Sequence, residues 1–76
     1  MEGERFTWGD TVVISASAPE NYRPGELAEV CSIWEIKTEK NAIARGEPVG
    51  TFIYGVEFGD GKIMEIPKRY LEKYHE

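Results

Sequence analysis

The chain has 76 residues, enough for one small domain, with little room for an enclosed active site beside a hydrophobic core. Hydrophobic residues make up 41% and charged residues 30%, a balance that argues against disorder. The net charge of −5 argues against nucleic acids and anionic membranes as main partners, because Lys and Arg provide most of that binding.

The single cysteine, Cys31, excludes an internal disulfide and fits a cytoplasmic setting. Cys31 and His75 are the only soft or imidazole ligands, so we expect no four-ligand zinc site. We also expect no other cofactor. The first ten residues lack the basic start and apolar run of a signal peptide. No segment approaches the about 20 apolar residues that a membrane span needs.

The first predicted strand covers residues 11–16, where Val12 and Ile14 share one face. Residues 17–26 contain two prolines, an asparagine and a glycine, so we expect a loop.

A long second strand is predicted over residues 26–37. A helix is the competing interpretation there, but the segment is rich in β-formers. Ile33 breaks the alternation set by Ala28 and Val30, which predicts a bulge near Cys31 and Ser32. Cys31 itself is interpreted as a small packing residue.

Residues 38–50 are expected to form a second long loop, functional or mobile. The third strand covers residues 51–58, with one face predicted to be apolar. That face consists of Phe52, Tyr54, Val56 and Phe58. Tyr54 and Phe58 are expected in the core and Phe52 at its margin. Gly55, on the other face, predicts a bend or a close contact.

The segment Gly59–Asp60–Gly61 predicts a tight hairpin, with Gly61 in the left-handed region and Asp60 bonding to its own turn. A fourth strand follows, which Pro67 ends, and then one tight helical turn and a short last strand. Glu57 and Glu65 are expected on solvent faces. We therefore interpret the three acids around this hairpin as structural and not as a metal site.

This order of strands, loops and turns resembles an SH3-like barrel. The likeness rests on a run of residues from Gly9 to Leu71: Gly9–Asp10, Val12, Ile14, Pro24–Gly25, Ala28, Val30, Ile33, Tyr54, Val56, Phe58, Gly59–Asp60–Gly61, Ile66–Pro67 and Leu71. It implies an all-β domain spanning residues 1–76, with a five-stranded barrel over about residues 9–74 and a 3₁₀ turn before the last strand. Within that fold the chain is similar to small stand-alone bacterial proteins such as immunity protein family 31.

The resemblance implies a binding module and not an enzyme, so no catalytic residue is predicted. SH3-like barrels bind partners between their first two long loops, where aromatic residues make strong contacts. The candidate protein interface is therefore Glu20, Tyr22, Arg23, Trp34 and Glu35. Seven acidic and only two basic residues lie in residues 1–36, which favours a protein partner with a basic surface.

Two alternatives stay open. One is an RNA-binding module similar to KOW or Tudor barrels, whose candidate face is Lys37, Lys40, Arg45, Lys62, Lys68 and Arg69. The other is a small structural subunit of an enzyme, which would expose an apolar patch of several hundred Å². If the module binds a protein, a toxin inhibitor is one specific form that it could take.

Overall fold

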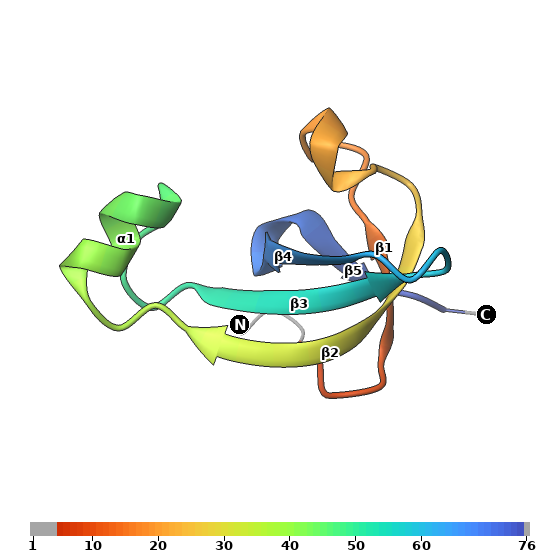
Figure 1. Cartoon of the computed structure of the whole chain (residues 1–76), viewed down its shortest axis with the longest axis horizontal. Helices are drawn as coiled ribbons and strands as arrows, with labels where there is room; N and C mark the ends of the chain where they lie inside the picture. Colours follow the sequence, from red (N-terminus) through yellow and green to blue (C-terminus); the bar gives the residue numbers. More distant parts are fainter. Residues whose placement is uncertain (1–4, 76) are drawn as a thin grey trace.

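The computed structural model describes residues 5–75 and is mostly β (Figure 1). Its elements in chain order are β1 (Thr11–Ile14), the 3₁₀ turn η1 (Glu20–Tyr22), β2 (Leu27–Glu35), α1 (Glu39–Arg45), β3 (Phe52–Phe58), β4 (Ile63–Pro67), the 3₁₀ turn η2 (Lys68–Tyr70) and β5 (Leu71–Lys73). The five strands form one antiparallel sheet in the order β4-β3-β2-β1-β5. The five predicted strands and the 3₁₀ turn before the last of them are confirmed. Within residues 5–75, no helix has the length and apolar character needed to cross a membrane.

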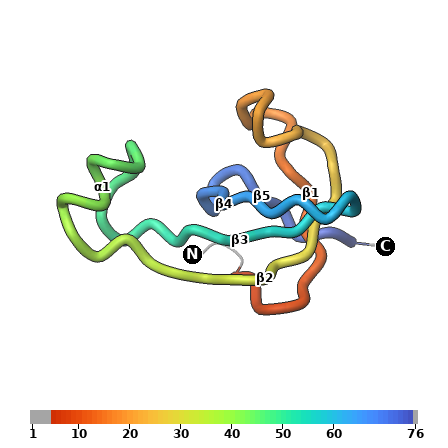
Figure 2. Tube along the Cα trace, in the orientation of Figure 1, coloured from red at the N-terminus to blue at the C-terminus, as the bar shows by residue number. Residues whose placement is uncertain are grey.

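The longest strands, β2 and β3, form a hairpin that extends past β1 and ends at α1 (Figure 2). The predicted bulge in β2 is present, because the register with β3 shifts between Val30 and Ser32. Ser32 then pairs with Gly55, whose missing side chain leaves room for it. Cys31 is exposed at this bulge, so its interpretation as a packing residue was wrong. The extra residue of the bulge places its side chain outside the core.

The main core lies on one face of the sheet, where apolar side chains at alternate positions of the strands meet. Its fully buried members include Val12, Ile14, Val56 and Ile66. Tyr54 and Phe58 are buried and Phe52 lies at the margin, as predicted. Phe6 is also buried in this core, with its ring edge-on to Tyr54 at 5.2 Å between centroids.

The predicted β3–β4 hairpin is confirmed in detail. Gly61 has a φ of 89°, and its amide donates to the carbonyl of Phe58 at 2.9 Å. The Asp60 carboxylate accepts from the backbone N–H of Lys62 at 3.1 Å. Glu57 and Glu65 are both exposed, as expected.

Residues 38–50 are not a loop throughout, because α1 occupies their centre. Thr38 caps its start by accepting from the amide of Asn41, and Gly46 ends it with a φ of 69°. A second small cluster of Ile36, Ala42 and Ile53 lies under the helix, with Trp34 packed against it. The helix therefore covers the outer face of β3 at Ile53. Because α1 has only seven residues, this packing stabilises it more than its intrinsic helix propensity does.

Candidate functional site

Part of the predicted interface lies in the β1–β2 loop. Tyr22 packs against the main core and faces Tyr70 of η2, with 5.7 Å between ring centroids. Arg23 follows in the left-handed region, with a φ of 66°. Its guanidinium lies 4.4 Å from the centroid of the Phe58 ring. Glu20 is exposed in η1. Tyr22 and Arg23 therefore tie the loop to the rest of the domain.

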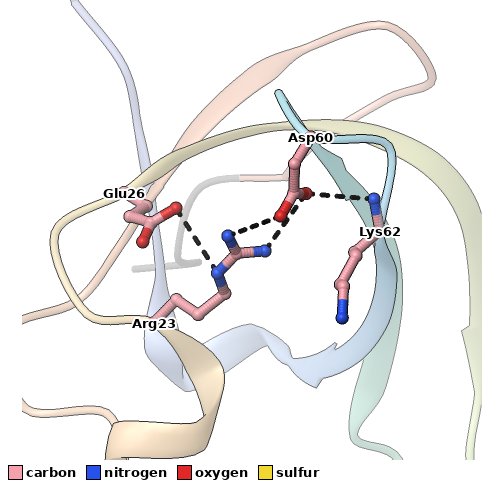
Figure 3. Close-up of polar contacts among 4 residues, drawn as sticks. All are labelled: Arg23, Glu26, Asp60 and Lys62. Carbon is pink, nitrogen blue, oxygen red and sulfur yellow. Dashed lines mark hydrogen bonds and ion pairs between the residues drawn. The ribbon is translucent and has the colours of Figure 1, made fainter.

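Arg23 also joins the loop to the β3–β4 hairpin through Asp60 (Figure 3). Its two terminal nitrogens donate to the Asp60 carboxylate at 3.3 and 2.9 Å, and its Nε lies 3.5 Å from Glu26. The hydrogen bonds from Arg23, and then the amide of Lys62, lower the pKa of Asp60 below its ordinary value. The pKa of Arg23 is raised, mainly by the hydrogen bond to Asp60. Sequence reasoning missed this pair because 37 positions separate the two residues.

The rest of the predicted interface lies elsewhere. Trp34 and Glu35 end β2 beside α1, whereas η1 lies toward the other end of the β2–β3 hairpin (Figure 1). Trp34 is half-buried against the second cluster, and the guanidinium of Arg45 lies 4.9 Å from its ring centroid. The structure therefore does not bring the five predicted interface residues together into one surface.

The candidate RNA-binding residues are also dispersed. Lys37, Lys40 and Arg45 lie at or in α1, whereas Lys62 lies in the hairpin turn at the far end of β3 (Figure 1). Arg45 forms an ion pair with Glu65 of β4. Arg69 forms another with Glu47, at 2.7 Å. Two of the six cations are thus already paired within the protein.

A different site lies between residues 5–8, β3 and η2. Two pockets there, of about 490 and 230 Å³, share the lining residues Phe6, Phe52 and Lys68. We call the two together the Phe52 groove. The larger pocket is bordered by η2, the start of β5 and the chain entering β3. The smaller one lies between residues 5–8 and the strands β2 and β3. The larger volume lies within the range of about 300–1,000 Å³ typical of ligand pockets.

The Phe52 groove combines an apolar floor with positive charge. Phe6, Phe52 and Tyr54 provide aromatic surface. In the smaller pocket Trp8 is 66% exposed. Three basic residues line the groove, Arg5, Lys68 and Arg69, against one acid, Glu72. Lys68 borders both pockets and takes part in none of the ion pairs found within residues 5–75.

One wall of the groove is held by a buried carboxylate. Glu47 is only 7% exposed, and its ion pair with Arg69 joins the segment after α1 to η2. The Arg69 guanidinium also lies 4.7 Å from the ring centroid of Tyr70. These contacts fix the position of Arg69 at the groove, while its side chain remains 56% exposed.

Of the groove residues, sequence reasoning had named Lys68 and Arg69, as part of the RNA-binding alternative. It missed Arg5 and Phe6, which precede the predicted barrel. The sequence signal that could have identified this segment is the closeness of two aromatic residues, Phe6 and Trp8. The contact of Phe6 with Tyr54 depends on tertiary packing that no local sequence pattern contains.

The acidic residues give no metal cluster in the part of the chain that the structure describes. Asp60 is engaged by Arg23 and Glu65 by Arg45, so both carboxylates already have cationic partners.

Comparisons with known proteins return no match: no protein-family model, no curated protein and no solved structure is significantly similar to the chain. The site must therefore be interpreted from its own chemistry.

Proposed function

We propose that this chain is a small SH3-like barrel that works without catalysis, as a protein-interaction module in the cytoplasm. Support for the barrel comes from the strand pairing, in which β1 lies between β2 and β5, and from the 3₁₀ turn between β4 and β5. A fold alone names no function, so the support for a binding role comes from a site.

The observation that carries the proposal is the Phe52 groove. It places aromatic side chains next to an exposed Trp8 and next to Lys68, which forms no ion pair with any residue in the range 5–75. Trp and Arg are among the residues that dominate the energetics of protein interfaces, and Trp8, Arg5 and Arg69 line this groove. Inhibition of a toxin is one specific form of this function that a small acidic protein could serve.

The proposal is tested by capture from a nuclease-treated lysate of the source organism, with the tagged protein as bait and mass spectrometry as the readout. We expect one protein at stoichiometric yield that survives moderate salt. Its identity would distinguish a toxin from a larger enzyme. Failure to capture any protein, with RNA recovered when nuclease is omitted, would replace the proposal with the RNA-binding alternative.

A further inference from the structure

The lining of the Phe52 groove is more basic than the protein as a whole. The net charge is −5, yet the groove lining holds three basic residues and one acid. Arg69 is paired with Glu47, which leaves Lys68 and Arg5 against Glu72. General attraction to a basic partner therefore does not describe the chemistry at this site. Carboxylates are the groups that Lys68 and its neighbours would select.

The apolar part of the groove favours an occupant that also carries a large apolar side chain. Phe6 and Phe52 line both pockets, so a side chain that enters either pocket can contact an aromatic ring. The larger pocket adds Leu71. An aromatic or long aliphatic side chain would remove this surface from water, which a purely acidic chain could not do.

The extent of the groove points to an extended peptide. Its lining comes from residues 5–8, β2, residues 50–51, β3, η2 and β5, and its two pockets share only Phe6, Phe52 and Lys68. Trp8 lines only the smaller pocket and Glu72 only the larger one, and both residues are exposed. An occupant that contacts both residues must therefore enter both pockets.

We infer that the Phe52 groove binds an extended segment of a partner protein, in which an aromatic or long aliphatic side chain is flanked by carboxylates. The side chain lies against Phe6 and Phe52, and the carboxylates lie near Lys68 and Arg5. This inference rests on the proposed function, since it specifies the partner of the same site.

The test uses the full chain, labelled with ¹⁵N, and three synthetic peptides of equal length. The first has a central Phe flanked by Asp and Glu, the second replaces that Phe by Ala, and the third replaces the acids by Lys. Amide shifts are followed by NMR up to about 1 mM peptide, where weak binding is still measurable. We expect the first peptide to shift the amides of Phe6, Phe52 and Lys68, with an affinity about tenfold or more above the other two.

Two protein variants with the same net charge distinguish binding at the groove from general electrostatic attraction to the protein. K68E reverses the charge of the groove, whereas K62E makes the same change in the hairpin turn. We expect K68E to weaken binding of the first peptide by about tenfold or more and K62E to leave it nearly unchanged. Dispersed amide spectra check that both variants fold, and K68Q replaces K68E if it does not.

Three results would overturn the inference: no shift in the groove amides, equal affinity for the acidic and basic peptides, or equal weakening by K68E and K62E. The proposed function fails separately. If the lysate experiment yields a stoichiometric protein whose capture K68E does not weaken, the chain is an interaction module that uses another surface. If no protein is captured, the proposed function fails whatever the peptides do.

Discussion

Gly55 of β3 lies directly against Ser32 of β2, at the bulge that bends the longest hairpin. A Cβ added to Gly55 would be 2.1 Å from the Ser32 Oγ and 3.3 Å from its Cβ. A glycine inside a strand normally weakens it, so its presence here is explained by the close approach of the opposing side chain.

We therefore expect G55A to lower the free energy of unfolding by about 1–3 kcal/mol, since Ser32 must move or rotate. In an S32A background the same change should cost less, because the Oγ is gone. Urea denaturation of the two single variants and the double variant measures this coupling. G59A is the matched control, because a Cβ at Gly59 meets nothing within 4 Å. A cost for G55A that is unchanged by S32A would show that the Oγ contact is not its cause.

The Glu47–Arg69 ion pair is asymmetric, since Glu47 is buried and Arg69 is mostly exposed. Removing Arg69 leaves a buried carboxylate without a partner, whereas removing the charge of Glu47 leaves a guanidinium that water can reach. We expect R69M to destabilise the protein by about 1–3 kcal/mol and E47Q to cost less. Adding E47Q to R69M should recover part of the loss. Thermal unfolding at neutral pH measures the stability of both single variants and of the double variant. A larger loss for E47Q than for R69M would contradict the view that the buried Glu47 carboxylate depends on Arg69.

The contact of Arg23 with Asp60 predicts a dependence of stability on pH. Because the pKa of Asp60 is lowered in the folded state, its contribution is present above the ordinary value of 3.8 and is lost as the pH falls through the folded value. The urea midpoint of D60N should therefore lie below that of the wild type at neutral pH and converge with it in acid. E57Q is the control, since no ion pair found within residues 5–75 uses Glu57. A difference between D60N and the wild type that persists unchanged in strong acid would exclude this linkage.

The N-cap of α1 offers a test of the helix that sequence reasoning missed. Replacing Thr38 by Ala removes the acceptor for the Asn41 amide and should cost about 0.5–2 kcal/mol. The loss should appear first as faster hydrogen exchange at the Ala42 amide, which bonds to the carbonyl of Thr38. T7A, at an exposed threonine of the N-terminal turn, is the control. If T38A leaves exchange in residues 39–45 unchanged, the cap does not stabilise α1.

The strands were predictable because their signals are local. Alternation in residues 52–58 identified β3 and its core face, and the slip at Ile33 located the bulge. Helix α1 was missed because its burial is minimal: Ala42 alone is buried, while Ile43 is 77% exposed. The cap residues Thr38 and Gly46 were the available signals, and the high polarity between them concealed the helix.

The site was less predictable than the fold. Aromatic and charged residues could be recognised as candidates, but their grouping depends on which segments meet. Tyr22 and Trp34 were grouped by loop position, and the structure separates them into different clusters. Phe6 and Lys68 come together only because residues 5–8 lie next to η2.

The most direct test of the central claim is lysate capture repeated with three baits: the wild type, K68E and K62E. If the Phe52 groove is the protein-binding surface, one stoichiometric protein should be retained by the wild type and K62E at moderate salt and be lost from K68E. Equal retention by all three baits would contradict the claim.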